Sequence, residues 1–344
     1  MNRNESKSVY VTTQPGLQNS AVSSMIADVP SDVMHYVHIS LGCVLLPALG
    51  LTGVVMNTLV TVVMWRHGLE ESTQILILTL ALSDLFFSAT RLIEHAENIL
   101  EQLDIVSMYT LGTFYTTYLK PLTNFSIATS ANIVAIMSVE RLIAVWFPFK
   151  ASRLITNFRT ILAIISTLLF LFPWYALDIW SYDIKWYFIR DYHRPMAVYY
   201  FSKFYLEHSN MYSILNSIRN SVFVMIIPPG SIIVSSIMIT IKLSRSSILV
   251  RHISSNAYVK RSKDLKVVKM ALALCFSVVS LRIIPTYMVA FIYYSTVLQK
   301  ILPANVVALI AYAQQVFFQA SASANLVVYV SMSPKFAKTL KTFS

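Results

Sequence analysis

Charged residues are scarce in this sequence. Asp, Glu, Lys and Arg make up 12% of its 344 residues, whereas hydrophobic residues make up 56%. Soluble globular proteins carry about 25% charged residues, so half that share leaves too little polar surface to coat a water-soluble fold of this length. The composition therefore excludes most soluble enzymes and nearly all nucleic-acid binders, and it predicts a polytopic membrane protein.

Cysteine and glycine are also rare. The two cysteines, Cys43 and Cys275, lie in apolar segments, so no extracellular disulfide framework is expected. The chain has 7 glycines and no sustained polar–apolar alternation, which argues against a membrane β-barrel. It has no glycine-rich phosphate loop and its 7 histidines show no metal-ligand spacing, so we expect no enzyme. The predicted fold class is an all-α membrane protein.

Long apolar segments account for most of the chain. A helix needs about 20 mostly apolar residues to cross the hydrocarbon core of a bilayer. Candidate spans cover residues 39–65, 74–92, 109–145, 158–179, 215–241, 267–294 and 301–329. The third is longer than the bilayer requires and must project beyond it. We therefore predict a bundle of seven transmembrane helices.

Lys and Arg are unevenly distributed between the connecting segments. A net charge of +11 would suggest nucleic-acid binding in a soluble chain, but membrane proteins concentrate Lys and Arg in cytoplasmic loops. With the N-terminus outside, the cytoplasmic segments hold 15 of these residues and the extracellular segments hold 7. This predicts an extracellular N-terminus and a cytoplasmic C-terminus. A glycosylation sequon at Asn4 agrees with that orientation, because glycosylation is luminal.

The spans divide the chain into three regions. Residues 1–37 are expected to form an extracellular tail without a cleavable signal peptide, because the first thirty residues hold no apolar core. Residues 38–332 form the seven-transmembrane domain, and residues 333–344 form a juxtamembrane helix with a short cytoplasmic tail. No internal repeat is visible, and an odd number of spans argues against two equal transporter halves.

The predicted spans contain a series of polar residues and prolines, preceded by a glycine. They are Gly53 and Asn57, then Asp84, then Glu140 and Arg141, then Pro228 and Pro229, then Pro285, then Asn325 and Tyr329. In this order they resemble the motifs of rhodopsin-like (class A) G-protein-coupled receptors, and the resemblance covers all seven spans. It implies a seven-helix bundle followed by a short amphipathic eighth helix, for which residues 334–340 are suitable.

The sequence departs from that family at several places, which include the following three. Thr116 stands where the family carries the cysteine that ties the third span to the second outer loop. Ile283 replaces the usual Trp before Pro285, and Leu326 replaces the usual Pro after Asn325. These losses suggest a divergent invertebrate branch, similar to neuropeptide and molluscan chemosensory-type receptors.

The resemblance implies an activation switch and a cation site. The switch residues are Glu140, Arg141, Asn325, Tyr329, Asn57 and Pro285. The cation site is an allosteric sodium ion held by Asp84, Ser130 and Asn325. A carboxylate at mid-membrane depth must be paired, solvated or protonated. The alternative is therefore a neutral structural Asp84, hydrogen-bonded to Asn57 and Asn325.

The outer halves of the spans carry the candidate ligand-binding residues. These are Arg91, Glu94, Lys120, Thr123, Arg219, Arg282 and Gln319. Ionisable groups at such depth are functional hypotheses by default, and their positive balance predicts an anionic ligand. The alternative is internal pairing, of Arg91 with Glu94 or of Arg219 with Asp178. Thr123 and Gln319 stand where the family's amine receptors carry Asp and its opsins carry Lys, which disfavours amines and retinal.

The predicted function is a plasma-membrane receptor. An extracellular peptide or small chemosensory ligand would bind among the outer ends of the spans and activate a heterotrimeric G protein. We expect no enzyme activity, no nucleic-acid partner and no cofactor apart from the sodium ion. The alternative is a seven-span transporter or ion channel, with Asp84 and Arg282 lining a permeation path.

Overall fold

The computed structural model describes residues 30–248, 268–269, 272–295, 302–332, 336, 338 and 339. Within them, seven helical stretches are long and apolar enough to cross a membrane. Their bounds are Ser31–His67, Ser72–Glu101, Ile105–Trp146, Asn157–Ile179, Ser209–Lys242, Leu272–Ile292 and Ala304–Val330. The predicted seven-helix membrane fold is confirmed. The sequon at Asn4, most of the basic segment 242–269 and most of the predicted eighth helix lie outside the described residues.

Several of these stretches combine α-helices with short π-helical segments. The elements that form them are α1 (Ser31–Val37), η1 (His38–Leu45) and α2 (Leu46–His67); α3 (Ser72–Glu101); α4 (Ile105–Phe114), η2 (Tyr115–Leu119) and α5 (Lys120–Trp146); α7 (Asn157–Ile179); α9 (Ser209–Ile218), η4 (Arg219–Ile226) and α10 (Ile227–Ile248); η6 (Val279–Ile283) and α12 (Ile284–Tyr294); and α14 (Ala304–Met332). Two short helices, α6 (Pro148–Leu154) and α8 (Lys203–Glu207), lie between them.

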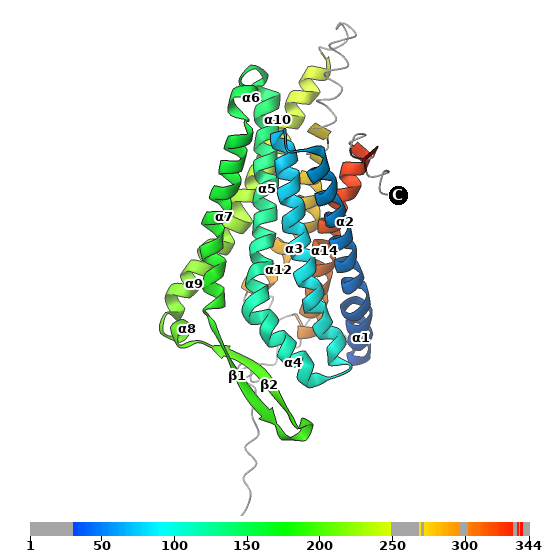
Figure 1. The fold of residues 1–344 in the computed structure, drawn as a ribbon, viewed down its shortest axis with the longest axis vertical. Helices are drawn as coiled ribbons and strands as arrows, with labels where there is room; N and C mark the ends of the chain where they lie inside the picture. Colours follow the sequence, from blue (N-terminus) through cyan, green and yellow to red (C-terminus); the bar gives the residue numbers. More distant parts are fainter. Residues whose placement is uncertain are drawn as a thin grey trace, which may run out of the picture.

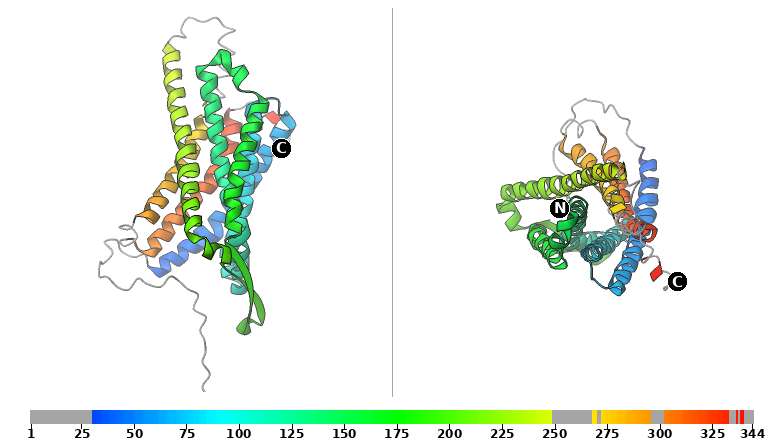
Figure 2. Two further views of the ribbon diagram at one scale, coloured as in Figure 1. Left: turned by 90° about the vertical axis from the view of Figure 1, so that its left-hand side faces the viewer. Right: turned by 90° about the horizontal axis from the view of Figure 1, so that it is seen from above.

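The long helices run alongside one another in a single bundle (Figures 1 and 2). Helix α3 packs against α2 and α5, and α5 also packs against α7 and α10, so α3 and α5 form its centre. Their inward faces bury Leu76, Leu80, Ile133 and Met137. Many large apolar side chains on the outward faces remain exposed in the isolated chain. Such apolar surface is suited to lipid.

Several helices begin at capping side chains. Asp104 accepts a hydrogen bond from the Val106 amide at the start of α4, and Thr156 accepts one from the Arg159 amide at the start of α7. The first five helical stretches are longer than the predicted spans. For example, α3 continues to Glu101, whereas the second predicted span ends at residue 92. Helical hydrogen bonding continues past the apolar stretch that marks the span, because the backbone does not require an apolar environment.

Two β-strands depart from the all-helical expectation. Strands β1 (Tyr182–Ile189) and β2 (Arg194–Phe201) pair in antiparallel register, with Tyr182 opposite Phe201 and Ile189 opposite Arg194. The short turn η3 (Arg190–Tyr192) joins them, and His193 completes it with a φ of 49°. The hairpin projects from the end of the bundle that is opposite to α6 (Figure 1). We call these two ends the hairpin end and the α6 end.

The hairpin is fastened to α4 and its N-terminal cap by polar contacts. Thr113 Oγ1 donates to the Ala197 carbonyl at 2.9 Å, and the Ala197 amide donates to Thr110 Oγ1 at 3.3 Å. Arg194 pairs with Asp104 at 2.6 Å. These contacts hold the loop in a chain whose two cysteines are both free. They therefore link the same two regions that the family's disulfide would link.

Candidate functional site

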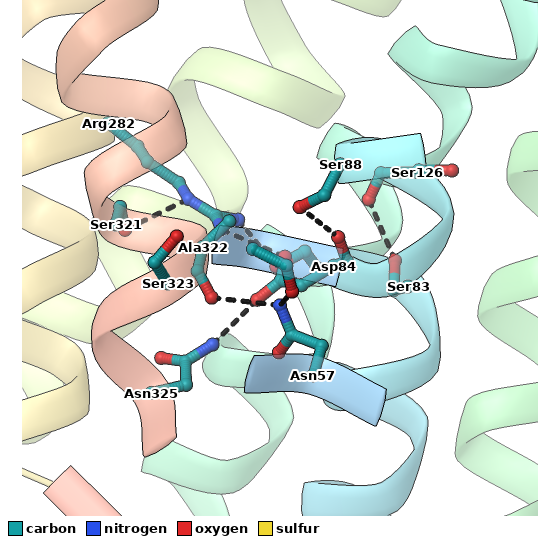
Figure 3. A network of polar contacts seen from close by, with 12 residues as sticks. Asn57, Ser83, Asp84, Ser88, Ser126, Arg282, Ser321, Ala322, Ser323 and Asn325 are labelled. Atoms are coloured by element: carbon teal, nitrogen blue, oxygen red, sulfur yellow. Dashed lines mark hydrogen bonds and ion pairs between the residues drawn. The ribbon is translucent and has the colours of Figure 1, made fainter. Parts of the chain in front are cut away.

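A buried ion pair lies in the middle of the bundle. Asp84 of α3 is 0% exposed, and Arg282 of η6 is 5% exposed. Arg282 donates from Nη2 to Asp84 Oδ1 at 2.8 Å, from Nη1 to Ser130 Oγ at 2.6 Å and from Nε to Ser321 Oγ at 3.0 Å (Figure 3). The guanidinium thereby joins η6 to α3, α5 and α14.

Both oxygens of the Asp84 carboxylate accept hydrogen bonds. Ser130 Oγ donates to Oδ1 at 2.8 Å, on the same oxygen that Arg282 contacts. Asn325 Nδ2 donates to Oδ2 at 2.6 Å. A charged group is buried at acceptable cost only when it is paired and hydrogen-bonded, and here Asp84 meets both conditions.

Asn57 ties the first helical stretch to this layer. Its Nδ2 donates to the Gly53 carbonyl at 2.9 Å within α2 and to the Ala322 carbonyl of α14 at 3.0 Å (Figure 3). At Gly53, a Cβ atom would lie 2.4 Å from Ser88 Oγ of α3. The missing side chain therefore allows the close contact of α2 with α3 beside the ion pair.

The backbone around Arg282 is irregular. Arg282 lies in the π-helical segment η6, and Pro285 follows near the start of α12. Proline has no amide hydrogen, so it interrupts the helical hydrogen-bond ladder. Thr286 Oγ1 donates to the Arg282 carbonyl at 2.6 Å. π-helical turns of this kind frequently occur at functional sites.

A polar cavity of about 340 Å³ lies nearer the hairpin end, between α5, α7, α9 and η4. Aromatic side chains of Tyr175, Tyr182 and Tyr212 form part of its wall. Its polar lining residues include Lys120, Asn124, Asp178, Asn216, Arg219 and Asn220. A concave site that combines apolar walls with a few polar groups is typical of ligand pockets.

Arg219 is held by several partners in this cavity. Its Nη1 donates to Asp178 Oδ2 and to the Trp174 carbonyl, both at 2.8 Å. Its Nη2 donates to Asn216, and the guanidinium lies 4.5 Å from the ring centroid of Tyr175. The Arg219 charge is therefore already neutralised by Asp178 within the chain.

Lys120 differs from Arg219 in this respect. It lines the same cavity, its side chain is exposed, and the described residues give it no hydrogen bond or ion pair. Glu97 of α3, which is partly buried, acts on it electrostatically. Lys120 is therefore the cation in the described part of this cavity that is available to a ligand.

Two of the predicted switch residues, Glu140 and Arg141, lie at the α6 end. Asn57, Asn325 and Pro285 lie at the Asp84–Arg282 layer instead. Arg141 Nη2 is 3.9 Å from Glu140 Oε2, and it also donates to Thr73 of α3. Thr160 of α7 donates to Glu140. The two adjacent charges on α5 thus hold α3 and α7 together at this end of the bundle.

Tyr329 of α14, another of the predicted switch residues, is buried and packs near Phe336, with tilted rings whose centroids are 5.9 Å apart. Phe336 in turn meets His67 of α2, with ring centroids 6.5 Å apart. These contacts bring the chain beyond α14 back against the bundle, as the predicted eighth helix requires, although that helix stays a prediction.

The sequence model of the family described as "Serpentine type 7TM GPCR chemoreceptor Srw" matches residues 46–344. The chain belongs to this family. A search of curated proteins finds no match for this Srw-family chain. The family match gives no support to the transporter or channel alternative.

The structure distributes the predicted ligand residues of this Srw-family chain over several places. Lys120 and Arg219 share the cavity. Arg91 pairs with Glu94, which also accepts a hydrogen bond from Tyr115 at 2.8 Å. The pairing alternatives stated for Arg91 and Arg219 are therefore the contacts that the structure contains.

The remaining predicted ligand residues face other partners. Gln319 lies 3.4 Å from His95, and Thr123 donates to the Leu119 carbonyl of the preceding turn at 2.8 Å. Arg282, predicted to face a ligand, instead contacts Asp84. Their roles in ligand binding stay predictions, but they do not line the described cavity together with Lys120.

The residues of the predicted sodium site do come together. Ser130 and Asn325 each donate a hydrogen bond to the Asp84 carboxylate. However, Arg282 already supplies the positive charge, and each carboxylate oxygen already accepts a hydrogen bond. Hard cations need such oxygens as ligands. This arrangement does not fit a sodium ion.

Sequence reasoning missed the three asparagines of the cavity. Asn124, Asn216 and Asn220 line it, and Asn220 donates to Asn216 at 2.9 Å. The sequence does contain a pattern that indicates them. Amide side chains are polar groups in a membrane span, and the four-residue spacing of Asn216 and Asn220 places both on one helix face. A neutral amide is a weaker sequence signal than a charged side chain, because its burial in a membrane span costs less free energy.

Proposed function

We propose that this chain is a rhodopsin-like chemoreceptor of the plasma membrane that binds a small or peptidic ligand in the cavity at its hairpin end and activates a heterotrimeric G protein at its α6 end. The observation that carries the proposal is the exposed Lys120 in the polar cavity of this chain. The family to which the chain belongs is described as chemoreceptors. The Glu140–Arg141 pair at the opposite end supports a coupling surface there.

The ligand class follows from the charges of the cavity. Asp178 and Arg219 neutralise each other, so Lys120 leaves a net positive charge. We infer a ligand with one carboxylate or a comparable anionic group, bound by the Lys120 ammonium. The side chains of Asn124, Asn216 and Asn220 offer amide donors and acceptors to its polar remainder.

The orientation is inferred from Lys and Arg. The α6 end carries Lys150, Arg153, Arg159 and Lys242 in its described part, and the adjoining segment 243–267 is also basic. Cytoplasmic segments accumulate such residues. The hairpin end would then face the outside, where a chemical stimulus arrives. An epitope tag at the N-terminus should be detected on unpermeabilised cells.

Signalling would follow from a population shift. A ligand favours the active state only by binding it better than the resting state. In the active state, Arg141 would leave Glu140 and Thr73, and the α6 end would open for a helix of the G protein. Arg141 is suited to such a role because its guanidinium can exchange hydrogen-bond partners while it stays charged.

The test is a calcium response in cells that express promiscuous G proteins. Matched probes would be small carboxylic acids with their primary amides, and short peptides with free or amidated C-termini. Lys120→Met should weaken the response to an active acid by about 10–150-fold, because a hydrogen bond to a charged group contributes about 1.5–3 kcal/mol. Lys120→Arg, which keeps the charge, should retain most of it. Equal potency of acid and amide would contradict the anionic ligand.

A further inference from the structure

The Asp84–Arg282 pair has no part in the ligand cavity, and it is buried between four elements of the bundle. The carboxylate is fully buried and the guanidinium nearly so. A buried carboxylate requires a positive partner, which can be a side chain or a metal ion. In this chain the positive partner comes from the sixth helical stretch.

The guanidinium contacts the atoms that would otherwise hold an ion. It donates to Asp84 Oδ1, to Ser130 Oγ and to Ser321 Oγ. Each of these atoms is an oxygen that could serve as a ligand of a hard cation. Asn325 adds a fourth polar side chain and donates its amide to the second carboxylate oxygen.

We propose that Arg282 is a built-in cation that takes the place of sodium at Asp84, so that the protein does not bind sodium there, and that removing the Arg282 side chain converts the same oxygens into a sodium site. A sodium site is expected after removal of the Arg282 side chain because of the oxygen atoms that remain. Asp84 would keep its negative charge, and Ser130 and Ser321 would regain free hydroxyl oxygens. The proposal concerns ion binding and does not depend on ligand or G-protein coupling.

The experiment measures thermal unfolding of the purified full chain in detergent. Each protein is compared in NaCl and in choline chloride, both at about 150 mM so that ionic screening is equal. The proteins are the wild type, Asp84→Asn, Arg282→Ala, and the double variant Asp84→Asn/Arg282→Ala. The double variant keeps the space but removes the charge that would hold the ion.

The wild type should unfold at the same temperature in both salts. Arg282→Ala should unfold about 2–4 °C higher in NaCl, the shift expected when sodium is present at about ten times its dissociation constant. The double variant should again show no difference. A sodium-dependent shift in the wild type that Asp84→Asn removes would overturn the proposal.

Equal unfolding temperatures for folded Arg282→Ala in the two salts would also overturn the proposal, because the side chain would then not be what excludes the ion. If Arg282→Ala is too unstable to purify, Arg282→Ser provides a second variant that leaves space and adds a hydroxyl oxygen. Its sodium dependence is expected to match that of Arg282→Ala. Sodium independence in a folded Arg282→Ser variant would count against the proposal in the same way.

Discussion

Replacing Arg219 tests whether this arginine serves the fold or the ligand. In Arg219→Met, the Asp178 carboxylate would stay buried with Tyr212 as its remaining side-chain partner among the described residues. Removing one partner of a buried ion pair costs about 3–5 kcal/mol. At about 2–3 °C per kcal/mol for a chain of this length, the unfolding temperature should fall by about 6–15 °C.

The assay is a double-mutant cycle on thermal unfolding in detergent. It compares the wild type, Arg219→Met, Asp178→Asn and the double variant. We expect the double variant to be more stable than the sum of the single effects predicts, because neither buried charge is left without its partner. If the two single effects add up within about 0.5 kcal/mol, the structural pairing is refuted and Arg219 is again a candidate for ligand binding.

A matched control is provided by the exposed pair of Lys203 and Glu207. Their charged atoms are 3.6 Å apart, four residues apart in sequence and open to solvent. Exposed pairs of this kind contribute little to stability. Lys203→Met should therefore leave the unfolding temperature unchanged, and a decrease as large as that of Arg219→Met would show that the assay reports charge removal in general.

Two further predictions concern the ends of the bundle. Arg141→Ala should abolish G-protein activation while surface expression, measured by an epitope tag, stays unchanged; normal signalling from this variant would contradict the proposed switch. Hydrogen bonds from Arg194 and Ser107 lower the pKa of Asp104 to about 2 from an ordinary value of 3.8. A lowered pKa means that the ionised form contributes stability above the ordinary value, and that this contribution is lost as the pH falls toward 2. In the wild type, the rate of protease cleavage in the hairpin should therefore stay constant between about pH 5 and 8. In Asp104→Asn, the rate should be higher than in the wild type at every pH in that range.

Much of the fold could be predicted because the bilayer imposes a length on each span. An apolar run of about 20 residues is a local property, so seven such runs indicated seven helices. The ends of the helices were less accurate. The first stretch begins at Ser31, whereas the predicted span began at residue 39, because a helix extends beyond the apolar run once its backbone bonds are satisfied.

The hairpin could not be predicted for a related reason. A strand reveals itself in sequence by alternation, which requires one buried and one exposed face. Most residues of β1 and β2 are exposed on both faces, and the aromatic residues lie on both. The turn also lacks glycine, because His193 adopts the left-handed conformation. Neither of the usual signals was therefore present.

The partner of Asp84 was beyond sequence reasoning because contact between helices depends on their relative heights. Asp84 and Arg282 are 198 residues apart in sequence. Both are ionisable groups inside predicted spans, and the free-energy cost of burying either alone indicates that each needs a partner. A single sequence does not state at which depth the sixth span places its residues, and the π-helical segment around Arg282 alters that depth further.

Helix α5 connects the three polar regions of the bundle. It carries Lys120 at the cavity, Ser130 at the Asp84 network and Arg141 at the α6 end. At 1.5 Å per residue these positions are about 15 Å apart in turn. A rigid helix transmits displacement but does not by itself provide two states, which coupling between sites requires. The irregular backbone at η6 is better suited to provide two states. The Arg282 side chain bonds to three other elements, and these bonds would be made or broken at the same time. In the proposed mechanism, the effect of a ligand bound at Lys120 would therefore be transmitted to Arg141 through the Ser130–Arg282 contact and not along α5 alone.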